Sequence, residues 1–129
     1  MNVEEQIYKE NILDHYKNPR NTGPLSPRTW NHRELNTSCG DSIELYVRLG
    51  SDGRVEAASF EGRGCAISQA AASMLTDAVR GMTVDELRAL GQDDVMELLG
   101  IPVGPTRIKC AMLGLKTLQR GLDMHLAGN

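Results

Sequence analysis

The sequence predicts an α+β fold in which a three-stranded antiparallel sheet carries helices packed on one of its faces. Between residues 29 and 60, stretches with alternating apolar and polar side chains are separated by short turns, as in antiparallel strands. From residue 66 onward, apolar side chains instead recur every three or four positions, as in helices. Because the strands precede most of the helices rather than alternating with them, we expect the helices to cover one face of the sheet.

A first helix is expected over residues 4–17. Tyr8, Ile12 and Tyr16 recur at four-residue spacing and predict its buried face. The polar stretch 18–24, which contains Pro19, Gly23 and Pro24, ends this helix and continues as a loop through Pro27.

Three strands are expected next. Residues 29–36 are ambiguous and are interpreted as an edge strand, and residues 37–41 form a turn. Residues 42–49 alternate, so that one side of this strand faces the core and the other side carries Glu44, Tyr46 and Arg48. A turn at residues 51–53 leads into the third strand, residues 54–60.

The remainder of the chain is expected to be helical. A helix over 66–80 ends at Gly81, and Thr83 with Glu86 predicts a capping box for a second helix that ends near Gly91. A short helix starts at residue 93 or 94 and stops at Gly100. The last helix covers residues 106–126, and its apolar row consists of Ile108, Met112, Leu115, Leu118, Leu122 and Leu126.

Length and composition limit the classes of function. The 129 residues fit a single domain, 1–129, with one core. A net charge of −3 without a basic tract argues against a nucleic-acid partner. The chain has no apolar run long enough to span a membrane and no signal peptide at its start, so we expect a cytoplasmic protein that does not associate with membranes.

The three cysteines indicate metal or thiol chemistry rather than disulfides, because their number is odd and a reducing compartment is expected. Cys65 lies where a strand is expected to give way to a helix, behind a predicted glycine hinge formed by Gly62 and Gly64. A helix N-terminus favours the thiolate, which is the form that attacks or binds metal. The alternative is that Cys65 is a small buried residue at a tight corner.

A shared metal site would combine Cys39, Cys65 and Cys110, each near the end of an expected element. No pair forms a Cys-x-x-Cys motif, so zinc ribbons and thioredoxin-like sites are excluded. Asp41, two residues after Cys39, is the natural fourth ligand, and three thiolates with one carboxylate suit Zn²⁺ or an iron–sulfur cluster. The single oxygen donor is the weaker ligand, which fits a carrier. The alternatives are three unrelated cysteines and an Asp41 that only forms a turn.

Other polar residues play lesser roles. Arg107 and Lys109 flank Cys110 and are interpreted as supporting charges that favour thiolates, because protonated side chains offer no lone pair to a metal. Solvated charge at a helix start is the alternative. The three histidines are not adjacent to any cysteine and are interpreted as surface or structural residues: His15, His32 and His125.

Four motifs, spread over nearly the whole chain, resemble the U-type iron–sulfur scaffold family, which comprises IscU, SufU and the N-terminal domain of NifU. The matching residues are Tyr8, Asp14-His15-Tyr16-Lys17-Asn18-Pro19-Arg20-Asn21 and Gly23; Cys39-Gly40-Asp41; Phe60, Gly62, Gly64-Cys65 and Ile67-Ser68; and Arg107-Ile108-Lys109-Cys110-Ala111.

The resemblance implies an IscU-like fold with the site at one end of the molecule. By similarity, the cluster or zinc ligands are Cys39, Asp41, Cys65 and Cys110. It also implies that an IscS/SufS-like cysteine desulfurase supplies persulfide sulfur. With iron, this sulfur builds a transient [2Fe–2S] cluster that passes to apo iron–sulfur proteins, while the isolated protein holds Zn²⁺.

Two departures separate this chain from parts of the family. Lys109 stands where many IscU members have His, as in SufU-like chains, yet the insertion usual in SufU-like chains between the second and third cysteines is missing. The segment Ile101-Pro102-Val103-Gly104-Pro105 also differs from the Leu-Pro-Pro-Val-Lys segment that a chaperone reads in IscU. We therefore do not expect a dedicated Hsp70-type chaperone partner.

Two mechanisms remain open from the sequence. The first is a non-enzymatic scaffold on which a cluster is assembled. The second is a zinc-dependent sulfurtransferase in which Cys39 leaves the metal to accept persulfide sulfur. A zinc deaminase is excluded, because that class needs a Cys-x-x-Cys pair and none is present.

Overall fold

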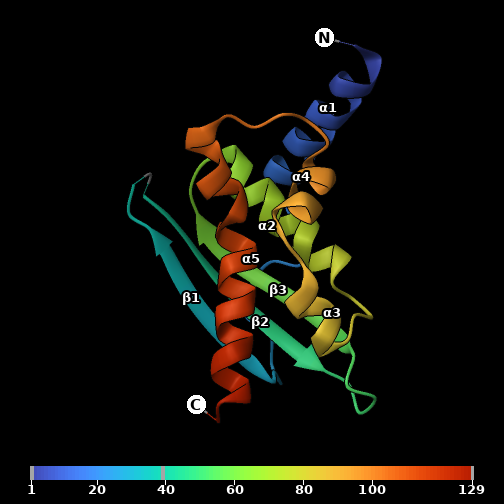
Figure 1. Cartoon of the computed structure of the whole chain (residues 1–129), viewed down its shortest axis with the longest axis vertical. Helices are drawn as coiled ribbons and strands as arrows, with labels where there is room; N and C mark the ends of the chain where they lie inside the picture. The colour runs from blue at the N-terminus through green and yellow to red at the C-terminus, as the bar shows by residue number, and fades with distance from the viewer. Residues whose placement is uncertain (1, 39, 129) are drawn as a thin grey trace.

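The computed structural model describes residues 2–38 and 40–128. Figure 1 shows one sheet, with the C-terminal helix running along it. The N-terminal helix lies at the upper right of this view. In chain order, the elements are α1 (Val3–Lys17), β1 (Trp30–Asn36), β2 (Asp41–Leu49), β3 (Val55–Arg63), α2 (Ala66–Ala78), α3 (Val84–Ala89), α4 (Gln92–Leu99) and α5 (Pro105–Leu126). Among the described residues, no helix is both long and apolar enough to cross a membrane.

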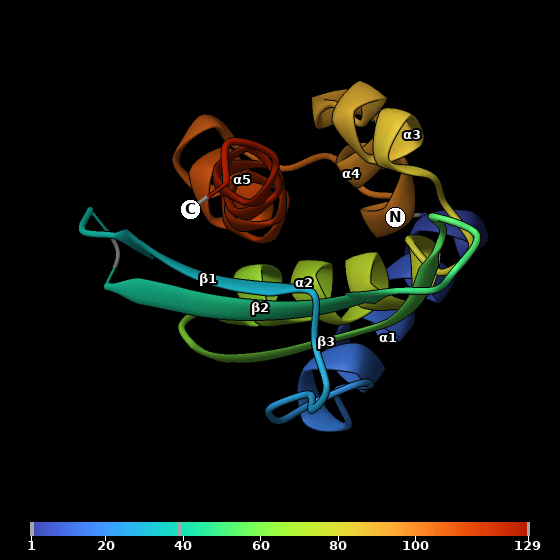
Figure 2. The same ribbon diagram turned by 90° about the horizontal axis from the view of Figure 1, so that it is seen from below.

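The sheet has the predicted antiparallel order β1-β2-β3. Trp30 pairs with Val47 across β1 and β2, and Ser42 pairs with Arg63 across β2 and β3. β1 is therefore an edge strand, as expected. In Figure 2 the sheet is seen edge-on, with α5, α3 and α4 on one side. The predicted class, an antiparallel sheet with helices on one face, is confirmed.

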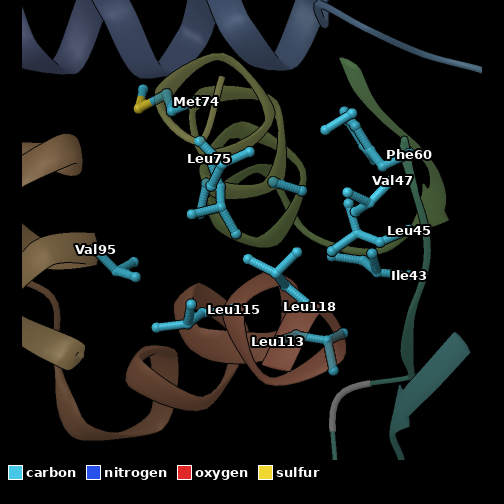
Figure 3. Packing of buried hydrophobic residues seen from close by; sticks show 14 of the residues in the cluster. Ile43, Leu45, Val47, Phe60, Met74, Leu75, Val95, Leu113, Leu115 and Leu118 are labelled. Carbon is cyan, nitrogen blue, oxygen red and sulfur yellow. The ribbon is translucent and has the colours of Figure 1, made fainter. Parts of the chain in front are cut away.

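The core lies between this face of the sheet and the two helices α2 and α5 (Figure 3). Alternation in β2 points Ile43, Leu45 and Val47 inward, as predicted, and each is at most 2% exposed. The helices α2 and α5 approach closely where Gly114 faces Ala72, because a Cβ at Gly114 would already lie 3.4 Å from the Cα of Ala72. The small residues thus let two helices share one sheet face.

The opposite face of the sheet is covered in part by the loop over residues 18–29. The hydroxyl of Ser59 donates to the carbonyl of Gly23 at 2.7 Å, and the guanidinium of Arg28 lies 5.5 Å from the ring centre of Tyr46. Tyr46 was placed on the solvent side of its strand by sequence alternation, and it does point to that face, but only 6% of it is exposed. Arg28 of this loop, a segment without a periodic signal, contributes to the burial by lying over the ring, and the Tyr46 hydroxyl donates to Oε1 of Glu61 at 2.6 Å.

Several details of the predicted elements are wrong. Tyr16 does not lie on the buried face of α1, since it is 44% exposed, and His15 is buried in its place. β3 does not end at Phe60 but continues to Arg63, so Gly62 lies within a strand and forms no hinge. Gly62 is needed for close approach, because a Cβ there would lie 2.7 Å from the carbonyl oxygen of Ser42.

The helix ends follow ordinary capping chemistry. Thr83 and Glu86 form the predicted capping box of α3. Gly100 ends α4 in a left-handed conformation, with φ of 73°. α2 ends two residues before the predicted position, at Ala78, and Leu126 at the end of α5 is 48% exposed rather than part of its buried row.

Candidate metal centre

Three segments that are distant in sequence meet at one end of the molecule. They are the start of β2, the connection between β3 and α2, and the first turns of α5, which gather at the upper left of Figure 1. These segments bring together Asp41, Cys65 and Cys110, whose ligand atoms all lie within 4.8 Å of one another. Three of the four predicted ligands are therefore neighbours in space.

Asp41 reaches this point because of the register of the sheet. It is the first residue of β2, and the pairing of Ser42 with Arg63 places it beside the residue that follows β3, Gly64. Oδ1 of Asp41 accepts a 3.1 Å hydrogen bond from the backbone N–H of Cys65, and Oδ2 lies 3.9 Å from Cys65 Sγ. The carboxylate is 2% exposed, so it faces the thiols rather than solvent.

Gly64 is required for this approach. Its φ is 152°, and a Cβ at this position would lie 2.1 Å from Oδ1 of Asp41 and 2.7 Å from the hydroxyl oxygen of Ser68. The backbone therefore leaves the space that the carboxylate occupies. Of the two glycines predicted to shape the approach to Cys65, Gly64 has the expected positive φ and Gly62 does not.

The two described cysteines occupy different helical positions. Cys65 is the N-cap residue of α2, at the helix start where the sequence placed it, and it is half-buried. Cys110 lies in the second turn of α5 and is 4% exposed. Cys110 shares its side of α5 with the buried Leu113 and Thr117, at spacings of three and seven residues, so its thiol points inward. Of these two thiols, Cys65 is thus the more accessible from outside.

The chemistry of these donors fits a metal. Two donors held by one tetrahedral Zn²⁺ lie roughly 3.5–3.8 Å apart, given bond lengths of about 2.0–2.3 Å. The 4.8 Å limit on the three ligand atoms, and the 3.9 Å separation of Cys65 Sγ from Asp41 Oδ2, need only small side-chain adjustments to meet that geometry. Two thiols and a carboxylate are donors for zinc or iron rather than for magnesium or calcium.

Three further residues were predicted to belong to the site: Cys39, Arg107 and Lys109. Cys39, the predicted fourth ligand and persulfide acceptor, lies outside the described residues. Arg107 and Lys109 are exposed on the first turns of α5, and neither makes an ion pair with a carboxylate of residues 2–38 or 40–128. Their role as supporting charges stays a prediction.

Sequence reasoning missed two polar residues that support the site. Ser68 is fully buried, and its hydroxyl donates to the carbonyl of Cys65 at 3.1 Å. The amide of Gln69 donates to the Ser68 hydroxyl at 3.2 Å. Both sit in the first turn of α2, and the signal that would have found Ser68 is its spacing of three residues from Cys65.

Comparison with known proteins identifies the family. The protein-family model described as NifU-like N terminal domain matches residues 7–129 of this chain. The chain belongs to this family. Zinc-dependent sulfurtransferase SufU of Bacillus subtilis is 37% identical over an alignment that covers 97% of this chain and 95% of the relative. The iron-sulfur cluster assembly scaffold protein IscU of Escherichia coli K12 is 34% identical over 82% of this chain and 84% of the relative.

Solved structures agree with this assignment. A structure described as a putative iron-sulfur cluster assembly scaffold protein for the SUF system, from Fervidobacterium islandicum, has a TM-score of 0.75 and 27% identity, and the match covers 92% of this chain and 98% of the other.

The alignment with Bacillus SufU spans 142 positions, more than the 129 residues of this chain, so Bacillus SufU carries residues that this chain lacks. The family therefore contains both a scaffold and a sulfurtransferase among relatives of this chain.

Proposed function

We propose that this protein is an iron–sulfur cluster assembly scaffold. It receives sulfur from a cysteine desulfurase, combines it with iron in a transient [2Fe–2S] cluster, and passes the cluster to apo-proteins. The observation that carries the proposal is the convergence of Asp41, Cys65 and Cys110 at one end of a family member, with their ligand atoms within 4.8 Å of one another. In this proposal Cys39 completes the ligand set.

Each residue has a distinct part in the proposal. Cys110, fixed and buried on α5, holds the cargo from inside, and Cys65 holds it from the accessible side. Asp41 supplies the one oxygen donor, which binds soft iron–sulfur cargo less firmly than a thiolate. Release therefore begins at Asp41. The same four donors hold Zn²⁺ when no iron and sulfur are supplied, and Zn²⁺ would then act as a structural cation that keeps the thiolates together.

A second function is favoured by the match to Bacillus SufU, which covers nearly the full length of both chains. Under this alternative, the protein is a zinc-dependent sulfurtransferase. The Cys39 thiolate attacks the outer sulfur of the donor's persulfide, a new S–S bond forms, the donor's S–S bond breaks, and the donor cysteine leaves as thiolate. Lys109, exposed beside Cys110, would stabilise a thiolate that has left the metal.

Partners and location follow the same reasoning. An IscS/SufS-like desulfurase and apo iron–sulfur proteins are the proposed partners, and the altered segment at residues 101–105 argues against a dedicated Hsp70-type chaperone. We propose a cytoplasmic location, because an odd number of cysteines fits a reducing compartment better than a disulfide framework. We treat residues 1–129 as one domain, because the buried side chains of the described residues form a single cluster.

One experiment separates the two mechanisms. Zinc-loaded protein is incubated anaerobically with a cysteine desulfurase and cysteine, and half of the sample then receives Fe²⁺ and reductant. A scaffold should develop visible cluster absorption that each of Cys39→Ser, Cys65→Ser and Cys110→Ser abolishes. A sulfurtransferase should instead accumulate persulfide on one cysteine without iron, keep its zinc and accelerate the desulfurase. Strong acceleration without any cluster would overturn the scaffold proposal.

A further inference from the structure

A groove runs along α5 beside the connection between β1 and β2. It consists of two neighbouring hollows of about 340 and 380 Å³, both of which are lined by Asn36, Ser38 and Lys109. We call it the α5 groove and define it by Leu35, Asn36 and Ser38 on one side and Lys109, Met112 and Lys116 on the other. Since Lys109 precedes Cys110, the groove begins next to the metal centre.

The α5 groove carries positive charge without a matching negative charge. Lys109 and Lys116 are seven residues apart, about two helical turns, so both lie on the same side of α5. Within residues 2–38 and 40–128, no aspartate or glutamate lines either hollow, and none lies within salt-bridge distance of either lysine. This local excess of positive charge occurs in a chain whose net charge is −3.

The next basic residue along α5, Arg120, is already paired with a carboxylate. Nη1 of Arg120, one turn beyond Lys116, donates to Oε1 of Glu34 at 2.7 Å, and Oε2 of Glu34 lies 2.5 Å from Nε2 of His32. β1 thus supplies a carboxylate to the cation just outside the groove, while its side chains inside the groove are apolar or neutral. The two lysines are therefore the cations that a ligand from outside can neutralise.

Apolar surface lies between the charges. Leu35 is 54% exposed although it belongs to a strand, and Met112 is half-buried against the core. An unbranched methionine adapts to different apolar partners. A ligand that fits the groove therefore combines acidic side chains with at least one apolar side chain.

We propose that the α5 groove docks an acidic segment of the partner protein that exchanges sulfur or iron–sulfur cargo with the cysteines. Carboxylates of the segment pair with Lys109 and Lys116, and an apolar side chain packs on Leu35 and Met112. The proposal rests on the proposed function, because it assumes that a protein partner approaches the metal centre. Nucleic acid is a poor fit, since two lysines in an acidic chain neutralise too few phosphates.

The test uses the full zinc-loaded chain and a short fluorescein-labelled peptide of Asp and Glu residues with two leucines. A matched peptide carries Asn and Gln in place of the acids. Binding is followed by fluorescence anisotropy at about 50 and 200 mM salt, because exposed charge pairs weaken as salt screens them. The acidic peptide should bind more tightly than its amide counterpart, and the difference should shrink at the higher salt.

Variants locate the binding to the groove. Lys116→Glu should weaken the acidic peptide at least fivefold, while Lys116→Arg should keep the affinity. Lys9→Glu, on the exposed side of α1, changes the net charge equally and serves as the matched control. Zinc content and melting temperature of each variant verify that the fold and the metal centre are intact.

Several results would overturn the proposal. These are equal losses in Lys116→Glu and Lys9→Glu, equal binding of the amide peptide, displacement of the peptide by duplex DNA, or a dimer of this chain that Lys116→Glu dissociates. A failure of the proposed function looks different, because the cysteines would then accept neither sulfur nor cluster while the peptide still binds in a Lys116-dependent way.

Discussion

The backbone N–H of Cys65 donates a 3.1 Å hydrogen bond to Oδ1 of Asp41, although 24 positions separate the two residues. The carboxylate thereby caps the first turn of α2, whose own N-cap side chain, a thiol, makes no capping hydrogen bond. Asp41 thus has a structural role and a proposed ligand role at once. A substitution of Asp41 therefore needs a control variant of this chain that separates the structural role from the ligand role.

Cys65→Ser is expected to cost more metal affinity than Asp41→Ala. Thiolate is the better donor for zinc and iron, and a serine hydroxyl stays protonated at neutral pH. A competitive chelator titration of the zinc-loaded variants measures the two affinities. Equal losses would show that the oxygen ligand is not the weak one.

Asp41→Ala is expected to make a reconstituted cluster longer-lived and its transfer to an apo-protein slower, because the labile oxygen donor is gone while the proposed thiolates remain. Asp41→Asn is the control, since its amide oxygen can still accept from the N–H of Cys65. The decay of visible absorption and the rate of transfer to an apo-ferredoxin are measured. A faster decay in Asp41→Ala than in the wild type would contradict the expectation.

Gly64→Ala is expected to destabilise the protein and to displace Asp41. The added Cβ would lie 2.1 Å from Oδ1 of Asp41, and φ at this position is 152°. Gly53→Ala separates the two causes, because Gly53 has φ of 78° but no atom within 4 Å of the added Cβ. We expect Gly53→Ala to cost about 1 kcal/mol, and Gly64→Ala to cost more and to lose zinc affinity. Equal unfolding free energies and unchanged zinc binding would refute the steric role of Gly64.

Much of this site was predictable from sequence, because its residues sit at the ends of elements that local patterns identify. The alternation of residues 42–49 put Asp41 in the turn directly before a strand, one residue from its place at the start of β2, and the small, helix-forming residues after Cys65 placed it at the start of α2. The crowding at Gly64 could not be predicted, because it depends on the register between β2 and β3. That register is decided by pairing across the sheet, which no local pattern contains.

The errors in the predicted elements also arise from contacts between distant parts of the chain. Tyr16 fits the four-residue spacing of Tyr8 and Ile12, but α1 buries His15 instead, because Ser73 of α2 offers it a hydrogen-bond partner. The burial of Tyr46 depends on a loop that crosses the outer face of the sheet. Tertiary contacts of this kind override helical and strand periodicity, which report only local order.

The aerobically prepared protein is expected to hold one Zn²⁺ per chain, and complete chelation should lower its melting temperature. The proposed ligands come from three distant segments, so metal binding ties them together in the folded state alone and adds to its stability. Metal analysis and thermal unfolding before and after chelation check both statements. Cys65→Ser, with weakened binding, should show a smaller change on chelation. An unchanged melting temperature in the wild type would count against a stabilising metal.

The last prediction concerns acid pH and the buried His15. Its Nδ1 lies 2.7 Å from the hydroxyl of Ser73, which also accepts from the backbone N–H of Arg20 at 2.9 Å. With the Arg20 N–H bound to one of its lone pairs, the Ser73 hydroxyl can donate its proton to Nδ1 of an uncharged His15 ring. Burial first, and then the nearby Arg20 guanidinium, lower the pKa of His15 below its usual 6.5, against a smaller opposite effect of Asp77 and Asp14.

The lowered pKa of His15 determines how the stability of the fold changes with pH. Because the pKa of His15 is lower in the folded than in the unfolded chain, the unfolded chain binds more protons between the two values. The free energy of unfolding should therefore fall as the pH drops below about 6.5, and this loss should level off below the folded-state pKa. His15→Gln keeps a hydrogen-bonding group toward Ser73 but cannot titrate. Urea unfolding of both proteins from pH 8 to pH 5.5 should show a steeper loss in the wild type, whereas parallel curves would mean that His15 does not couple protonation to folding.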